Sequence, residues 1–124
     1  MANPNIVNVT SIFGVTTYLT PSNTSPTVWT ALTPAVNTVN KVNNIVASNV
    51  TGSAVAVTVS INSATGGGGT AFDIAFQISV PANASLIIID KTTSIYVGET
   101  QSIVVTVGTG NAIELTSSFE ALTS

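Results

Sequence analysis

Hydrophobic and polar residues alternate with a period of two along most of this chain. Stretch 54–62, AVAVTVSIN, places its large side chains on one side: Val55, Val57, Val59 and Ile61. Stretch 71–80, AFDIAFQISV, repeats the pattern with Phe72, Ile74, Phe76, Ile78 and Val80. Alternation of this kind is typical of β-strands with one buried face. Two strands with buried faces are therefore predicted here.

Weaker forms of the same pattern predict further strands. They lie at 5–13, 15–20, 27–33, 39–48, 84–90, 94–97, 101–108 and 112–122. Proline, asparagine and glycine separate these stretches, which is the turn chemistry of β connections. No stretch has an apolar stripe of helical period. Many short strands predict a two-sheet sandwich or a small barrel. We expect an all-β fold with very little helix: a single antiparallel β-sandwich, jelly-roll-like or Ig-like, with residues 1–124 as one domain.

Four consecutive glycines stand in SATGGGGTA, residues 63–71. A phosphate-binding loop needs its glycines between a strand and a helix, and the P-loop form ends in Gly-Lys-Ser/Thr. Here the run leads into another alternating stretch, and no lysine is nearer in sequence than Lys91. Glycine gives a hairpin tip conformational freedom without steric cost. We therefore predict a mobile connection between strands 54–62 and 71–80.

Composition removes several classes of function. The chain has no cysteine and no histidine, so thiolate chemistry, disulfides and the commonest general base are absent. Its basic residues are Lys41 and Lys91 alone, too few to neutralise a nucleic-acid backbone. The longest aliphatic run is Leu86 to Ile89, far short of a membrane span. The beginning of the chain shows no signal-peptide pattern, so the product is expected to stay in the compartment where it is made.

The acidic residues offer little for catalysis or metal binding. Glu114 and Glu120 share a strand face, but six residues of strand separate them by about 20 Å, too far for a glycosidase pair. Asp90 and Glu99 offer oxygen ligands that calcium would accept, yet the dense Asp/Asn spacing of a dedicated calcium loop is missing. A Ser–Lys nucleophile would need Lys41 or Lys91 buried. We expect no enzyme, no catalytic residue, no cofactor and no metal site.

Three large aromatic residues are the candidates for a protein interface: Trp29, Tyr18 and Tyr96. Aromatic side chains anchor protein contacts and stack on sugars. Isolated aromatics on strands are nevertheless more often part of the core, and we favour that alternative. Trp29 is the leading interface candidate of the three. Trp29 or Tyr96 is the platform of an alternative carbohydrate-binding module.

The scarcity of charge is the most unusual property of the sequence. Charged residues make up 6% of the chain, against about 25% in a typical soluble protein. Natural β proteins usually protect strand edges with Lys, Glu or Pro, because open edges recruit other chains. With 44% hydrophobic residues, the chain does not have the composition of a disordered protein. We expect its surface to be covered by copies of itself or by other proteins.

Several stretches resemble small virion structural proteins of tailed bacteriophages, especially those of marine cyanobacteria. They are KVNNIVASNVTGSAVAVTVSI (41–61), VPANASLIIIDKTTSIYVGETQSIVVTV (80–107), AIELTSSFEAL (112–122) and the opening MANPNIVNVTSI. Similar chains often have Gly-Asp-Ser where this one has GET at 98–100, and tyrosine where Phe119 stands. Both differences are conservative for structure.

The resemblance implies an abundant, non-enzymatic virion component, made in the cytoplasm of a host bacterium. The expected role is capsid decoration, in which a cement protein binds and stabilises the head shell. The expected partners are the major capsid protein or other virion proteins, and further copies of the chain. A tail, neck or fibre accessory protein is the first alternative, and a carbohydrate-binding β-sandwich module the second. Neither nucleic acid nor membrane is expected as a partner.

Overall fold

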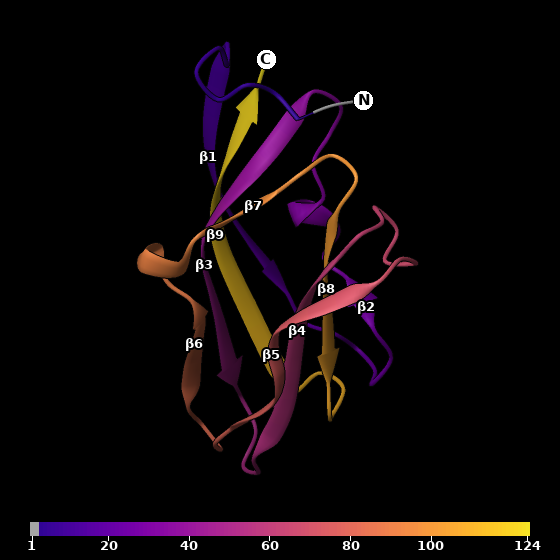
Figure 1. Ribbon diagram of the computed structural model, residues 1–124. Coiled ribbons are helices and arrows are strands. Elements are labelled where there is room, and N and C mark those ends of the chain that lie inside the picture. The colour runs from indigo at the N-terminus through magenta and orange to yellow at the C-terminus, as the bar shows by residue number, and fades with distance from the viewer. Residues whose placement is uncertain (1–2) are drawn as a thin grey trace.

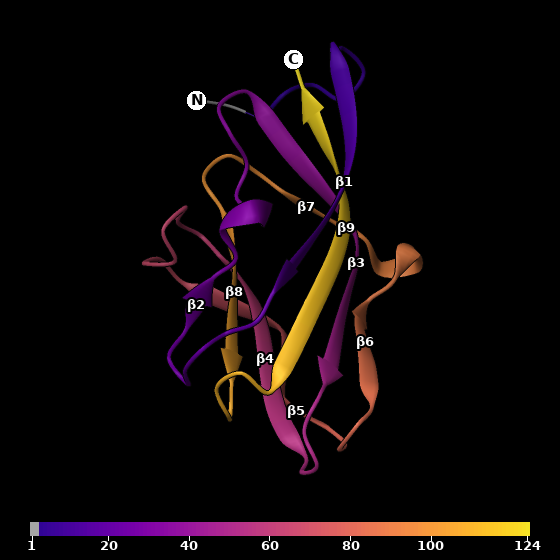
Figure 2. The same ribbon diagram turned by 180° about the vertical axis from the view of Figure 1, so that it is seen from behind.

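The computed structural model describes residues 3–124 and consists of two packed antiparallel sheets (Figures 1 and 2). Sheet A has the order β1-β9-β3-β6, and β7 also pairs with β3; sheet B has the order β2-β8-β4-β5. The strands are β1 (Ser11–Leu19), β2 (Thr27–Val28), β3 (Thr38–Asn49), β4 (Val55–Asn62), β5 (Ala71–Val80), β6 (Ser85–Ile89), β7 (Ile95–Val97), β8 (Ser102–Val107) and β9 (Ile113–Thr123). Two 3-10 turns complete the described elements, η1 (Thr30–Leu32) and η2 (Lys91–Thr93).

The predicted fold class is confirmed: residues 3–124 form an all-β sandwich without an α-helix. Its core lies between the sheets, where both contribute their alternating apolar residues. Sheet B supplies Val57 and Val59 from β4, and sheet A supplies Ile45 from β3 and Leu115 from β9. The alternation read from stretch 54–62 thus places its valines in the core, as predicted. The first two residues of the predicted domain lie outside the described residues.

The N-terminal third differs from the strand predictions. Stretches 5–13 and 15–20 were predicted as two strands, but one strand, β1, runs through Gly14. Gly14 pairs with Glu120 in the same unbroken register as its neighbours, so it does not end the strand. Stretch 27–33 is a strand only at Thr27–Val28 and then turns into η1. The backbone N–H of Trp29 still bonds to the carbonyl of Ile103 (2.8 Å), and η1 follows at once.

The prediction of one buried face for stretch 71–80 is wrong. β5 is the last strand of sheet B, and its pairing with β4 shifts register twice between Val57 and Ser60. Within this irregular region Gln77 has φ 47 and its N–H bonds to the hydroxyl of Thr58 (2.9 Å). Extra residues in a strand rotate the following side chains away from a strict alternation. Phe76 lies in this irregular region and is exposed, whereas Val80 is buried. Phe72 lies opposite Ile61 on the core side, and it is exposed because β5 is at the edge of the sheet.

A bulge in the middle of β3 shapes the outer face of sheet A. The register with β9 shifts between Val42 and Asn44, and the register with β6 shifts between Ile45 and Val46. Val42 and Ile45 point into the core, so Asn43 and Asn44 between them are both left on the outer side. β6 and β7 pair with different ends of β3, with η2 between them.

Candidate interaction surface

Trp29 is part of the core and is therefore not an anchor on the surface of the described chain. It is 1% exposed and belongs to the same apolar cluster as Leu32 and Ile103. Its position at the junction of β2 and η1 turns the indole inward beneath the edge of sheet B. This corrects the leading interface candidate from the sequence, and the alternative assignment of Trp29 to the core is the one that the structure supports.

Tyr18 and Tyr96 both lie on the outer face of sheet A, but at opposite edges. Tyr18 is in β1, and Tyr96 is in β7 opposite Lys41 of β3. They are 79% and 47% exposed. Three strand spacings separate β1 from β7, which is about 14 Å across the sheet, and the two residues also lie in different rows along it. They do not form a shared aromatic platform, and each remains a separate candidate for a protein contact.

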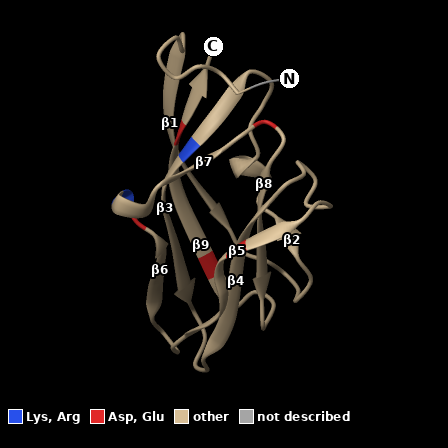
Figure 3. Cartoon of the chain, viewed as in Figure 1, with Lys and Arg blue, Asp and Glu red and all other residues tan. Residues whose placement is uncertain are grey.

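The outer face of sheet A can be followed row by row from the strand register. One row runs Gly14, Glu120, Lys41, Tyr96 across β1, β9, β3 and β7. Another runs Tyr18, Thr116, Val46, Ile87 across β1, β9, β3 and β6. Between them Thr16 and Ser118 share a hydroxyl hydrogen bond (3.0 Å). Charged residues are few in the chain as a whole, as Figure 3 shows, and on this face Glu120 and Lys41 are neighbours in one row.

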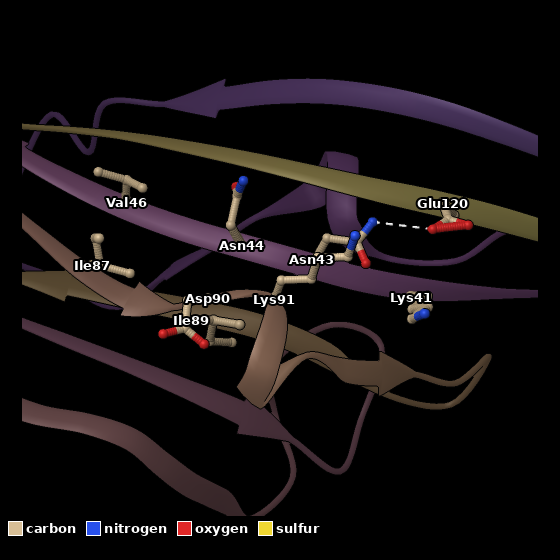
Figure 4. Close-up of a pocket in the computed structure, with 9 residues that line it drawn as sticks. All are labelled: Lys41, Asn43, Asn44, Val46, Ile87, Ile89, Asp90, Lys91 and Glu120. Atoms are coloured by element: carbon tan, nitrogen blue, oxygen red, sulfur yellow. Dashed lines mark hydrogen bonds between the residues drawn. The ribbon is translucent and has the colours of Figure 1, made fainter.

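A hollow of about 490 Å³ lies on this face above the bulge of β3 (Figure 4). We call it the sheet A hollow. It is lined by Lys41, Asn43, Asn44, Val46, Ile87, Ile89, Asp90, Lys91 and Glu120. Both lysines of the chain and two of its five acidic residues are therefore gathered here. This grouping could not be predicted from the sequence, because it depends on the bulge and on the way η2 folds beside β3.

The asparagines of the bulge tie β3 to β9. The amide of Asn43 donates to the carboxylate of Glu120 (3.2 Å), and the carbonyl oxygen of the Asn44 side chain accepts from the N–H of Ser118 (2.9 Å). Ser117, buried on the other face, donates its hydroxyl to the backbone carbonyl of Asn44 (2.7 Å). The bulge interrupts the ladder, and these side-chain bonds satisfy groups that the ladder leaves free.

Asp90 is the N-cap of η2. Its carboxylate accepts from the hydroxyl of Thr92 (2.6 Å) and from the N–H of Thr92 (2.9 Å), and Thr93 completes the capping box. These hydrogen bonds, led by that from the Thr92 hydroxyl, lower the pKa of Asp90 below its ordinary value. The carboxylate is thus held ionised on the rim of the sheet A hollow. Its role in the structure is a cap.

Glu99, the other acidic residue of the calcium hypothesis, is buried in the turn between β7 and β8. Its carboxylate accepts from the backbone N–H of Asn37, and its own N–H bonds to the side chain of Asn3 (2.8 Å). Glu99 thus connects the turn to the segment before β3 and to the N-terminal segment. Among residues 3–124, no cluster of three or more acidic side chains is placed to hold a metal ion. The arrangement does not support a calcium site at Asp90 and Glu99.

The glycine run forms the connection between β4 and β5, as predicted, but it is fastened to the sandwich. The side chain of Asn62 accepts from the N–H of Ala64 (3.0 Å) and of Gly69 (2.9 Å) and donates to the carbonyl of Gly67 (3.1 Å). Gly67 lies against Val28 and Val104 on the outer side of sheet B. The backbone N–H groups of Ala64 and Gly69 bond to Asn62, so the loop is not arranged as a phosphate cradle. The role of Asn62 was missed from the sequence.

Large apolar side chains are exposed on several described elements. They are Ile6, Val7, Ile12, Phe13, Val15, Tyr18, Val36, Val50, Phe72, Phe76, Ile78, Ile87 and Tyr96. Two groups stand out, one on the edge strand β1 and one on the edge strand β5. Exposed apolar groups of this extent mark surfaces that contact other molecules. The candidate interaction surface therefore consists of these two edges and the outer face of sheet A.

No protein-family model matches the chain, and no curated protein sequence matches it either. None of the helical segments within residues 3–124 has the length and apolar character needed to cross a membrane.

Proposed function

We propose that this chain is a non-enzymatic structural protein of a bacteriophage virion. Within the virion we propose a capsid decoration protein, which binds the head shell through the major capsid protein and stabilises it. The proposal combines the resemblance of the sequence to small tailed-phage virion proteins with the surface of the sandwich.

The observation that carries the proposal is an exposed apolar surface on a chain with almost no charge. The chain has seven charged residues among its 124. Three large aromatic side chains on its strands are exposed to solvent: Phe13, Phe72 and Phe76. A free monomer with such a surface is prone to associate. Contacts to neighbouring subunits would remove these side chains from water, and a shell supplies such neighbours in a fixed arrangement.

A cement protein acts by adding many modest contacts that bridge neighbouring shell subunits. Each contact stabilises the assembled state by mass action, and simultaneous contacts reinforce one another. A sandwich with two apolar edges and few charged residues suits this task. Because few ion pairs would take part, binding would depend weakly on salt.

The residues that line the sheet A hollow fit a contact surface better than a catalytic centre. Glu120 is bonded to Asn43, Asp90 caps η2, and Lys41 is only partly buried. The hollow could receive a small polar side chain of a neighbouring subunit, which the asparagine amides and the two lysines would bind. A carbohydrate-binding module loses one of its two candidate platforms, because Trp29 is buried, and keeps only the exposed Tyr96.

The location within the virion is tested by counting copies. The protein would be quantified in purified virions of the phage that encodes it, by calibrated gel staining against the major capsid protein. A copy number proportional to that of the shell subunit supports capsid decoration. A number close to a small multiple of the tail symmetry would assign the protein to the tail, neck or fibre instead. Absence from washed virions would overturn the proposal.

A further inference from the structure

One edge of sheet A is left open along its whole length. β1 is the last strand in the order of this sheet, and within residues 3–124 it pairs only with β9. That pairing is regular over nine residues, from Ser11 opposite Thr123 to Leu19 opposite Leu115, without a register shift. The far edge of β1 therefore presents a straight row of unpaired backbone groups.

The hydrogen bonds of β9 show which residues of β1 present these groups. The N–H of Ser118 points to β3, where it bonds to Asn44 (2.9 Å), whereas the carbonyl of Thr123 accepts from Thr10 on the side of β1 (2.8 Å). Since residues of a central strand alternate between their two neighbours, even-numbered residues of β9 face β3. Thr16, the partner of Ser118, consequently directs its N–H and C=O away from β9. The same holds for the other even-numbered residues of β1: Ile12, Gly14 and Tyr18.

The other edges of the sandwich carry features that discourage pairing. β2 has two residues. β5 has two register shifts, a residue with positive φ at Gln77, and the charge of Asp73. On the remaining edge, β6 and β7 are separated by η2 with Asp90 and Lys91. Bulges, short strands and charges are the usual protections of a sheet edge. β1 has none of them: it is long, regular and uncharged.

We propose that β1 pairs antiparallel with β1 of a second copy of this chain, about a two-fold axis at Val15. This register matches all nine residues of one strand with all nine of the other. It places Thr16 opposite Gly14 of the second copy and Ile12 opposite Tyr18 of the second copy. The N–H and C=O groups of these four residues point away from β9. In this register they can therefore exchange backbone hydrogen bonds with the same groups of the second copy. The two copies of sheet A become one continuous sheet.

The side chains of β1 favour a second copy as the occupant. An interface around a two-fold axis brings identical surfaces together, so any charge near the axis would face its own copy. β1 has no charge to repel its copy. On the outer face, Ile12 and Tyr18 form an aliphatic–aromatic cross-strand pair, a stabilising combination. On the inner face, Val15 meets Val15 of the second copy and Phe13 lies beside them; both side chains are exposed in the single chain.

This inference rests on the part of the proposed function in which other subunits cover the surface, and it names one of those subunits. It can be tested on the purified protein alone. The chain has no cysteine, so one introduced thiol is unique. At the axis, Val15 and its copy form a non-hydrogen-bonded antiparallel pair, whose Cα separation of about 4.5 Å suits a disulfide.

The experiment compares Val15→Cys with Thr17→Cys under mild oxidation. We expect Val15→Cys to give a covalent dimer on a non-reducing gel. Thr17→Cys is the matched control, because Thr17 lies on the same face but faces Phe13 of the second copy. The two introduced thiols would then be about 13 Å apart along the strands, and this variant should stay monomeric. Equal cross-linking of both variants, or none in Val15→Cys, would overturn the inference.

A second variant tests the backbone pairing itself. Thr16→Pro removes an N–H that points away from β9, so the backbone bonds between β1 and β9 remain. The exposed hydroxyl bond between Thr16 and Ser118 is the one bond within the sandwich that it removes. We expect this variant to keep the β-type circular dichroism spectrum and to lose the dimer in light scattering. A folded Thr16→Pro protein that still forms the wild-type dimer would contradict the proposal. If the protein is found in virions but Val15→Cys does not cross-link, only the β1 pairing fails. If Val15→Cys cross-links but washed virions lack the protein, only the proposed function fails.

Discussion

Val15 and Phe119 lie directly opposite each other on the inner face of sheet A, yet Phe119 is 6% exposed and Val15 is 40% exposed. Phe119 belongs to the core cluster, which β9 shares with β3. Val15 is one strand further out, at the edge of the sheet. Figure 1 shows the upper ends of β1, β9 and β3 extending beyond sheet B. On the inner face of β1, Phe13 and Val15 are therefore not covered by the chain itself, whereas Leu19 packs against the core.

The burial of Trp29 predicts a large difference between two substitutions. Trp29→Ala should lower the free energy of unfolding by about 3–5 kcal/mol, because it leaves a large cavity between the sheets. Trp29→Phe should cost clearly less, since it keeps most of the ring contacts and removes an indole N–H that has no acceptor among the described residues. Urea unfolding of the three proteins measures both. Equal losses in the two variants would mean that the aromatic ring contributes no packing, which would contradict the placement of Trp29 in the core.

Glu99 is predicted to stabilise the turn between β7 and β8 through Asn37. Glu99→Ala leaves the backbone N–H of Asn37 without its acceptor, and we expect a loss of about 1–3 kcal/mol in the free energy of unfolding. Glu99→Gln keeps an acceptor oxygen and should lose much less. Chemical denaturation of both variants is the measurement. Wild-type stability in Glu99→Ala would contradict this role.

The cap at η2 makes part of the stability dependent on pH. The pKa of Asp90 is lowered in the folded chain from 3.8, chiefly by the hydrogen bond from the Thr92 hydroxyl. A lowered carboxyl pKa contributes stability above the unfolded-state pKa, and this contribution is lost as pH falls through the folded-state pKa. Wild type should therefore exceed Asp90→Ala in stability at neutral pH, and the difference should shrink below pH 3.8.

That comparison requires thermal unfolding of both proteins across the acid range. Thr92→Val serves as a second control, because it removes the hydroxyl while leaving the carboxylate in place. It should reduce the pH-dependent difference without abolishing it, since the Thr92 N–H still bonds to Asp90. A difference between wild type and Asp90→Ala that stays constant through the acid range would refute the cap.

The glycine run provides a matched pair of substitutions. Gly67 has φ +75, and a Cβ there would lie 2.9 Å from a methyl carbon of Val28, whereas a Cβ on Gly68 would meet nothing within 4 Å. Gly67→Ala should therefore destabilise the protein by more than about 1 kcal/mol, and Gly68→Ala should be neutral or stabilising by about 0.4–1 kcal/mol. Urea unfolding distinguishes them. Equal effects would mean that the loop does not pack on sheet B.

The sequence was sufficient to predict those strands in which the alternation of apolar and polar residues matches the alternation of buried and exposed side chains. β4 is the clearest case, because it lies in the interior of sheet B and pairs on both sides. Val55, Val57 and Val59 are buried, as their alternation predicts. β5 has the same alternation but lies at an edge and contains bulges. Edge position and bulges depend on which strands become neighbours in the sheet. The alternation of apolar and polar residues does not predict the order of the strands.

The interaction surface was less predictable for the same reason. Trp29 looks like a strand residue in TVWTALT, but the turn into η1 places it in the core. The sheet A hollow gathers Lys41, Asp90 and Glu120 from three elements far apart in the sequence. Only the low charge of the chain pointed to a covered surface. The long, unprotected edge of β1 became recognisable once the strand order was known.

The central claim is that this sandwich is covered by neighbouring subunits in its working state. Light scattering of the purified wild-type protein over a range of concentrations, at low and high salt, tests it most directly. We predict a mass that rises above the 12.5 kDa of one chain as concentration increases, and that persists at high salt because few charges take part. A mass that stays at 12.5 kDa up to high concentration would contradict the account.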